Sequence, residues 1–177
     1  MAPKIIGILG RSRVGKDTVA DMIMTMYPEY HIQRLSYPLK KAVCSLYDYN
    51  MDQIESNAKE SIDARWNKTP RETIQSLTEY MMAYMGYDFF TKKLFHQYDS
   101  NNIPMFMIIP DIRYEHDILE IQKRNGIVIK VEREHAPIRH GFEQHIDFLK
   151  GNYRLKNTGS IEDLRGDVIK MMELIKS

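Results

Sequence analysis

The chain has 177 residues, the length of one domain, and its 43% of apolar residues can build a core. Its formal net charge of +1 excludes a global attraction to nucleic acid or acidic membranes, so any anion site must be local. The single Cys44 excludes an intramolecular disulfide, and no apolar run approaches the roughly 20 residues of a membrane helix. We expect one soluble domain over residues 1–177, located in the cytoplasm of its own cell or of an infected host.

The first part of the chain alternates short apolar runs with amphipathic segments. Residues 4–9 form a short, mostly apolar run that is followed by Gly10, and this run predicts a buried parallel strand. Residues 15–27 carry apolar side chains at helical spacing and predict a helix. A second strand at 31–35 and a second helix at 39–47 follow.

The middle of the chain is more polar. Residues 50–68 are charged, have little periodicity and predict a mobile helical excursion. Thr69 and Pro70, with Glu72 three residues after the threonine, predict the capped start of a helix that runs to about Tyr84. Residues 88–97 predict a shorter helix. We expect residues 50–86 to form an acceptor-binding region.

The last part resumes the alternation of strands and helices. We predict, in order, a strand at 105–109 that Pro110 stops, a helix at 114–124, a strand at 127–131, a strand at 153–155 and a helix at 160–175 capped by Ser160. Residues 132–150 are charged and weakly periodic, which is typical of a lid. The alternation predicts a three-layer α/β/α fold with a mainly parallel sheet.

Residues 10–18, with the sequence GRSRVGKDT, fit the G-x-x-x-x-G-K pattern of a P-loop between a buried strand and an amphipathic helix. Glycines let the backbone approach phosphate oxygens, successive N–H groups form an anion nest, and the helix N-terminus adds about half a positive charge. Lys16 has the length to reach the β and γ phosphates of ATP. We predict that ATP is bound by Gly10, Arg11, Ser12, Arg13, Val14, Gly15, Lys16, Asp17 and Thr18.

One position departs from the usual pattern, because Asp17 stands where a serine or threonine normally follows the lysine. That hydroxyl normally ligates Mg²⁺, and a carboxylate can also do so, directly or through water. We therefore predict Asp17 and Thr18 as candidate Mg²⁺ ligands. The alternative interpretation is a glycine-containing turn with Asp17 as an ordinary first-turn helix charge.

This loop resembles that of the phage and viral deoxynucleoside monophosphate kinases, which also carry Gly-Lys-Asp-Thr, while phosphomevalonate kinases share Gly-Lys-Asp. Three further segments are similar to the first family in the same order: residues 71–77 (RETIQSL), residues 110–116 (PDIRYEH) and residues 157–160 (NTGS). The resemblance implies a P-loop nucleotide kinase that uses ATP and Mg²⁺ to convert a deoxynucleoside monophosphate to the diphosphate. It also implies small-molecule nucleotides as ligands and a possible homodimer.

The candidate acceptor residues lie on one predicted helix. Arg71 and Gln75 are spaced i, i+4, and Glu79 extends the same face. A guanidinium and an amide suit an acceptor monophosphate and a base edge, and the resemblance implies that Arg71 binds the phosphate. A solvated helix face remains the alternative, and the family's Gly-Thr-Asp after Gln-x-Leu is replaced here by Thr-Glu-Tyr.

The remaining candidates follow predicted strands, where open α/β sheets carry their sites. Asp111 could orient Mg²⁺ or the acceptor and Arg113 could neutralise phosphate charge, the alternative being a cap and a surface ion pair. Arg133 and Arg139 lie in the lid-like segment, and the resemblance places Asn157 near the adenine. The predicted catalytic set comprises Lys16, Arg71, Asp111, Arg113 and Arg133.

Three alternatives stay open. A P-loop kinase could act on another small phosphorylated acceptor, such as phosphomevalonate, or the chain could be a nucleotide-binding switch without transfer activity. A guanine-specific NKxD motif after a strand is absent from the sequence. His135, His140 and His145 are evenly spaced, but no carboxylate pattern accompanies them, so we do not predict a zinc site.

Overall fold

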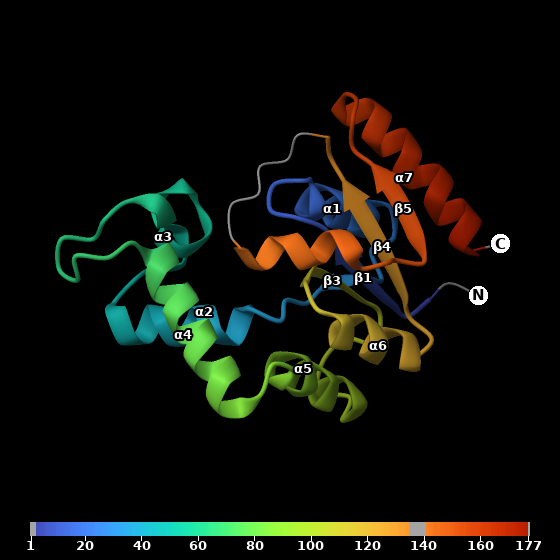
Figure 1. The fold of residues 1–177 in the computed structure, drawn as a ribbon. Coiled ribbons are helices and arrows are strands. Elements are labelled where there is room, and N and C mark those ends of the chain that lie inside the picture. Colours follow the sequence, from blue (N-terminus) through green and yellow to red (C-terminus); the bar gives the residue numbers. More distant parts are fainter. Residues whose placement is uncertain (1–2, 135–140, 177) are drawn as a thin grey trace. The chain divides into compact units, whose positions relative to one another are not determined.

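The computed structural model describes residues 3–134 and 141–176. The chain divides into two compact units, shown in Figure 1. Met1–Arg34 and Leu94–Ser177 form the first, which we call the sheet unit, and Leu35–Lys93 form the second, which we call the helical unit. Helix α5 (Phe89–Asp99) spans the boundary between them.

The sheet unit is built on five parallel strands in the order β2-β3-β1-β4-β5. They are β1 (Ile5–Leu9), β2 (His31–Ile32), β3 (Met107–Ile112), β4 (Ile127–Glu132) and β5 (Tyr153–Lys156). All five residues of β1 are buried, which a strand at the centre of a parallel sheet requires because helices cover both faces. The predicted α/β fold with a parallel sheet is confirmed.

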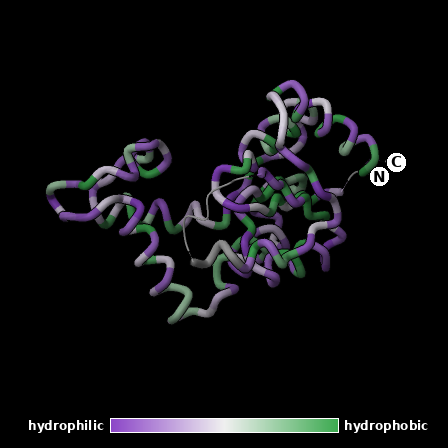
Figure 2. Tube along the Cα trace, turned by 45° about the horizontal axis from the view of Figure 1, so that its top comes forward, coloured by the Kyte–Doolittle hydropathy of each residue, from purple (hydrophilic) through white to green (hydrophobic). Residues whose placement is uncertain are grey.

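Helices cover the two faces of this sheet. Helix α1 (Lys16–Met26) and helix α7 (Ile161–Lys176) share one buried apolar cluster with the strands, including Ile6, Ile8, Val19, Ile23, Val168 and Met172. Helix α6 (Glu115–Lys123) packs on the other face, where a Cβ on Gly7 would lie 2.6 Å from Ile121 Cδ1. The hydrophobic residues of the strands gather between these layers (Figure 2).

The helical unit consists of α2 (Tyr37–Tyr47), α3 (Met51–Glu55), the short 3₁₀ helix η1 (Asn57–Glu60), α4 (Pro70–Met85) and the start of α5. Helix α4 begins and ends as predicted: the Thr69 hydroxyl accepts from the Glu72 amide, and the Glu72 carboxylate accepts from the Thr69 amide. Gly86 is its C-cap with a φ of 98°, a left-handed value that favours glycine. Val43, Tyr49 and Ile54 form the buried core of this unit.

Two predicted strand boundaries are wrong. Strand β3 does not stop at Pro110 but continues to Ile112, because the register shifts from Gly7 opposite Ile109 to Leu9 opposite Ile112. The extra residue forms an irregularity of the bulge type, where a proline without an N–H group is tolerated. Strand β2 has only two residues, His31 and Ile32, and pairs with β3 at the edge of the sheet.

The C-terminal elements include the 3₁₀ helix η2 (Gly141–Phe148), β5 and α7. Ser160 precedes α7 as predicted: its hydroxyl accepts from the Asp163 amide, and the Asp163 carboxylate accepts from the Ser160 amide. Within the described part of the chain, none of the helices combines the length and the apolar character needed to span a membrane.

Candidate functional site

Residues 10–18, the P-loop segment, connect the carboxyl end of β1 to the first turn of α1. Strand β1 has β3 on one side and β4 on the other, so the strand order reverses at this position. Open α/β sheets bind their ligands in the crevice at such a switch point. The strand, loop and helix that a P-loop requires are therefore all present.

The backbone of the P-loop segment needs glycine at two positions. A Cβ on Gly10 would lie 2.5 Å from the Val131 carbonyl oxygen, so β4 leaves no space for a side chain there. Gly15 has a φ of 102° and forms the N-cap of α1. A Cβ on Gly15 would lie 2.6 Å from Asn157 Nδ2. The segment is thus curled tightly against β4 and the residues that follow β5.

Lys16 folds back over the segment that precedes it. Its ammonium Nζ donates to the Arg11 carbonyl oxygen at 2.6 Å. The ammonium therefore lies over the loop whose amides are the expected phosphate ligands. A phosphate oxygen carries more negative charge than a carbonyl oxygen, so it can replace this carbonyl as the acceptor.

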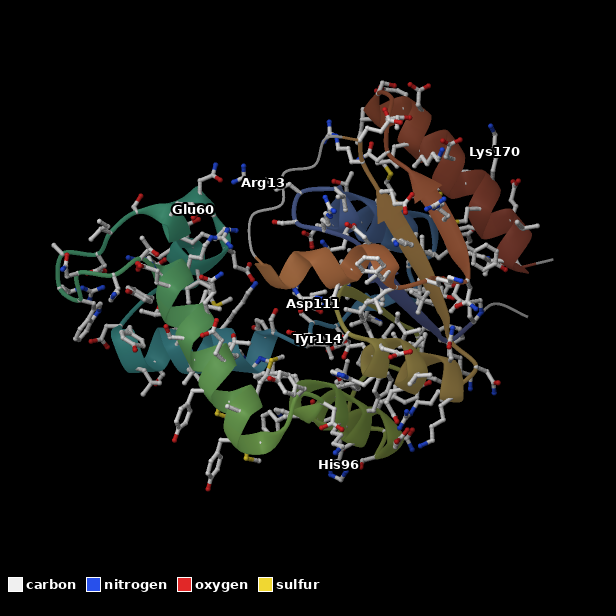
Figure 3. All side chains as sticks on the ribbon, viewed as in Figure 1. Arg13, Glu60, His96, Asp111, Tyr114 and Lys170 are labelled. Carbon is white, nitrogen blue, oxygen red and sulfur yellow. The ribbon has the colours of Figure 1, made fainter. Side chains whose placement is uncertain are left out.

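A cavity of about 420 Å³ opens beside the P-loop segment. This volume falls within the usual range for small-molecule sites. Three parts of the chain that are distant in sequence meet there: the loop with α1, the residue after β4, and the segment that leads into α7. The lining residues are Arg13, Gly15, Lys16, Asp17, Thr18, Arg133, Asn157, Gly159, Ser160, Ile161 and Leu164. Arg13 stands at the exposed side of the loop (Figure 3).

Asn157 is buried and holds the P-loop segment through a hydrogen bond to its backbone. Its Nδ2 donates to the Val14 carbonyl oxygen at 2.9 Å, and its backbone amide donates to the Glu132 carbonyl oxygen at 2.7 Å. One amide proton of the side chain is therefore committed to the shape of the P-loop segment. The sequence did not indicate this contact, because 143 residues separate the two partners. The predicted contact between Asn157 and adenine stays a prediction.

Asp17, the unusual residue of the loop, forms an ion pair with Arg34. The Arg34 Nη1 lies 2.7 Å from Asp17 Oδ1, and the Asp17 side chain is 66% exposed. Arg34 follows β2, and sequence reasoning did not include it among the site residues. A cation therefore faces the carboxylate whose charge a bound triphosphate would otherwise meet unscreened.

The donor set around Asp17 and Thr18 fits a magnesium ion bound together with phosphates. Among the described residues, no three or more histidine, cysteine, aspartate or glutamate side chains form a group that could hold a metal ion. Magnesium in such sites is held by one or two protein oxygens plus substrate phosphates rather than by a protein cage. The Asp17 carboxylate is exposed, and both residues line the cavity, so either can supply such an oxygen.

The second half of the predicted lid is anchored to β4 and to the P-loop segment. Buried Lys130 donates from Nζ to the carbonyl oxygens of Asp147 and Leu149, each at 2.8 Å. The Asp147 carboxylate also pairs with the Arg11 guanidinium of the P-loop segment. The end of η2 is therefore held on both β4 and the loop. Sequence reasoning missed this role for Lys130 and Asp147.

Only some candidates of the lid-like segment can be located. Arg133 is exposed and lines the cavity. His145 Nε2 lies 2.8 Å from the Arg113 carbonyl oxygen. Arg139, His135 and His140 lie outside the described residues.

Asp111 and Arg113 lie at the carboxyl end of β3, the strand next to β1. Asp111 is half-buried within the strand rather than after it, and exposed Arg113 follows the strand. Buried Asp117 holds the turn by accepting from the amides of Arg113 and Tyr114, both at 2.9 Å. Asp111 and Tyr114 are labelled in Figure 3. Neither Asp111 nor Arg113 is among the residues that line the cavity described above.

The tyrosine of this turn belongs to a stack of three rings. Tyr114 lies between His116 and His145, with 5.2 Å between ring centroids in each pair. His145 comes from η2, so the stack joins that helix to the end of β3. The stack therefore adds a further anchor to the C-terminal half of the lid-like segment.

The predicted acceptor residues all belong to α4 in the helical unit. Arg71 makes a forked contact with Glu60: Arg71 Nε lies 2.8 and 2.9 Å from the two carboxylate oxygens, and Nη2 lies 2.6 Å from Oε1. Gln75 is half-buried, and Glu79 is exposed. Sequence reasoning missed Glu60, because residues 50–68, predicted as a mobile helical excursion, have too little periodicity to distinguish one charged residue from another.

Comparison with known proteins identifies the fold. No protein-family model matches the sequence, and none of the curated proteins does so. The structure is similar to TT1252 from Thermus thermophilus, with 16% identity, 100% of both chains covered and a TM-score of 0.51. It is also similar to dephospho-CoA kinase from Campylobacter jejuni, with 13% identity, 97% of both chains covered and a TM-score of 0.52. A third similar structure is shikimate kinase from Aquifex aeolicus, with 12% identity, 96% of both chains covered and a TM-score of 0.50. The chain thus shares the α/β/α fold of these proteins.

Proposed function

We propose that the protein is a kinase that transfers the γ-phosphoryl group of ATP to a small phosphorylated acceptor. The observation that carries the proposal is the curled P-loop segment at the switch point of the sheet, with Lys16 folded over it and a cavity beside it. The fold shared with two enzymes named as kinases supports the same reaction class. We further propose a deoxynucleoside monophosphate as the acceptor, giving the diphosphate and ADP.

The donor half of the mechanism rests on charge and position. The backbone amides of the P-loop segment and the N-terminus of α1 would bind the donor phosphates, as Lys16 exchanges the Arg11 carbonyl for phosphate oxygens. Arg13 and Arg133 line the same cavity and add positive charge around the transferred group. A magnesium ion held by Asp17 or Thr18 would neutralise the donor oxygens that face it.

The acceptor half needs no general base. A monophosphate oxygen is already ionised near neutral pH, so it can attack without losing a proton. Catalysis then consists of alignment and charge neutralisation. The forked guanidinium of Arg71 suits an acceptor phosphate, and we assign Gln75 and Glu79 to the base and Asp111 and Arg113 to the reacting groups.

The choice of a deoxynucleotide rests on the four collinear segments that resemble the viral kinases. The same resemblance supports small-molecule nucleotides as the ligands and a homodimer as the assembly. Phosphomevalonate remains the alternative acceptor, because its kinases share the Gly-Lys-Asp loop.

An acceptor panel tests the proposal. The protein is incubated with ATP, Mg²⁺ and, one at a time, the four common deoxynucleoside monophosphates, the matching ribonucleotides and phosphomevalonate, while ADP and the phosphorylated product are quantified. We expect stoichiometric deoxynucleoside diphosphate and ADP with at least one deoxynucleotide. Turnover with phosphomevalonate alone would overturn the acceptor assignment. ATP binding without transfer to any acceptor would favour a nucleotide-dependent switch.

A further inference from the structure

The contact between Arg71 and Glu60 has the geometry of a guanidinium bound to an oxyanion. Three donor–acceptor distances between the two side chains fall between 2.6 and 2.9 Å, and both carboxylate oxygens take part. The side chains are 25% and 39% exposed, respectively, so the pair is partly shielded from water. A phosphate presents two oxygens to a guanidinium in the same forked arrangement. The Glu60 carboxylate thus occupies the position that a phosphate would take on Arg71.

The surrounding backbone holds Glu60 in this position. Glu60 is the last residue of η1, whose start is capped by the Ser56 hydroxyl, which accepts from the Ala58 amide at 3.0 Å. The Ser61 amide donates to the Ala58 carbonyl oxygen at 3.0 Å and closes the turn beyond Glu60. Glu60 is therefore presented by a short, capped helix rather than by an irregular loop.

The position also favours negative charge for a second reason. Arg71 is the second residue of α4, and the first turn of a helix carries part of the positive end of its dipole. A carboxylate and a phosphate both gain from this field, and a dianionic phosphate gains more than a monoanionic carboxylate. A phosphorylated acceptor can therefore displace Glu60, whereas an acceptor without a phosphate has no anionic group that binds the Arg71 guanidinium.

We propose that Glu60 is a specificity-determining residue: it occupies the acceptor-phosphate position on Arg71 until a phosphorylated acceptor displaces it. This inference rests on the proposed function, in which Arg71 binds the acceptor phosphate. Glu60 competes with phosphorylated acceptors for Arg71, and a ligand that carries no phosphate does not displace it. Its removal should therefore strengthen acceptor binding, whereas the removal of a residue that contacts the substrate should weaken it.

The test compares Glu60→Gln with wild type in steady-state kinetics for a deoxynucleoside monophosphate and for ATP. The amide keeps the shape of the carboxylate and removes its charge. We expect the acceptor KM to fall about three- to tenfold, with the KM for ATP unchanged. The matched control is Glu55→Gln, which removes a carboxylate from the adjacent helix α3 that pairs with Lys40 at 3.3 Å. The control should leave both KM values unchanged.

A binding measurement separates this inference from the proposed function. Inorganic phosphate is titrated into the wild type, Glu60→Gln and the double variant Glu60→Gln/Arg71→Gln, with binding followed by calorimetry. We expect tighter phosphate binding in Glu60→Gln by a similar factor, and loss of the gain in the double variant. This readout requires no turnover, so it holds even if the acceptor panel rejects the kinase reaction.

The inference fails if Glu60→Gln leaves the acceptor KM and the phosphate affinity unchanged, since Glu60 would then not compete for Arg71. It fails equally if Glu60→Gln raises the acceptor KM or lowers the phosphate affinity, since Glu60 would then orient Arg71 for binding. Circular dichroism and thermal unfolding identify a variant that has lost its fold. In that case Glu60→Ser, which keeps a polar residue at the end of η1, is measured in its place and judged by the same two criteria.

Discussion

Asn157 occupies the space that a side chain on Gly15 would need. The Asn157 Nδ2 would lie 2.6 Å from a Cβ on Gly15, and the same atom donates to the Val14 carbonyl oxygen at 2.9 Å. Asn157, which follows β5, and Gly15, which precedes α1, therefore fit only as a pair. The shape of the P-loop segment depends on a residue from the opposite end of the chain.

Replacing Asn157 with alanine should destabilise the loop. The change removes the donor to the buried Val14 carbonyl, so we expect the free energy of unfolding to fall by about 1 to 2 kcal/mol. ATP affinity should fall as well, because the loop amides are no longer held in place. Urea unfolding and calorimetric titration with ATP measure the two effects. The control is Asn102→Ala at an exposed position. Equal results for both variants would contradict the role given to Asn157.

Arg34 should contribute most to ATP binding when no magnesium is present. It pairs with Asp17 at 2.7 Å, so Arg34→Gln leaves the Asp17 carboxylate to repel the triphosphate. We expect ATP affinity, measured in EDTA, to fall about fivefold, which corresponds to about 1 kcal/mol for a partly exposed pair. The double variant Arg34→Gln/Asp17→Asn should recover most of this loss.

The double-mutant cycle also defines how this idea fails. If Arg34→Gln weakens ATP binding equally with and without Asp17→Asn, Arg34 acts on the nucleotide directly. Its pairing with Asp17 would then be incidental to binding.

Local signals in the sequence predicted much of the fold. The predicted start of α4 was correct because Thr69 and Glu72, which are three residues apart, together cap the helix N-terminus. The P-loop segment was recognisable for the same reason, since its glycines and lysine lie close together. The end of β3 was wrong because a bulge opposite β1 accommodates Pro110, and strand pairing is not visible in local sequence.

The missed site residues share one property: each acts through a partner that the sequence alone does not reveal. Arg34 meets Asp17 across 17 residues and Glu60 meets Arg71 across 11, while Asp147 meets Arg11 across 136. A charged residue in a polar segment has no pattern that identifies such a partner. The sequence therefore indicated Arg11, Asp17 and Arg71, but not the oppositely charged residues that pair with them in this structure.

Arg124 should stabilise the sheet unit in a pH-dependent way. Its guanidinium holds the pKa of Asp99 and the pKa of Glu120 below their ordinary values, mainly through hydrogen bonds to the two carboxylates. It also lies over the Phe95 ring, 4.3 Å from the centroid. Because more than half of the Asp99 side chain is exposed, we expect Arg124→Gln to cost only about 1 to 2 kcal/mol at pH 7.

The lowered pKa values determine how the stability difference between wild type and Arg124→Gln changes with pH. Carboxylates with a lowered pKa in the folded state stabilise it above their unfolded pKa near 4, and this contribution is lost as the pH falls through the folded values. The difference between wild type and Arg124→Gln should therefore be largest at neutral pH and shrink below about pH 4. Urea unfolding at several pH values measures it, with the exposed Lys92→Gln as the control. A difference that grows in acid would refute this role for Arg124.

The central claim is that residues 10–18 bind the phosphates of ATP with Lys16 completing the site. Lys16→Ala tests it most directly when ATP binding and phosphoryl transfer are measured together in one folded preparation. The control is Lys170→Ala on α7, whose side chain is 80% exposed. We predict a loss of transfer of at least about a hundredfold and much weaker ATP binding for Lys16→Ala, with the control unchanged. Transfer and ATP affinity within a few-fold of wild type would contradict the claim.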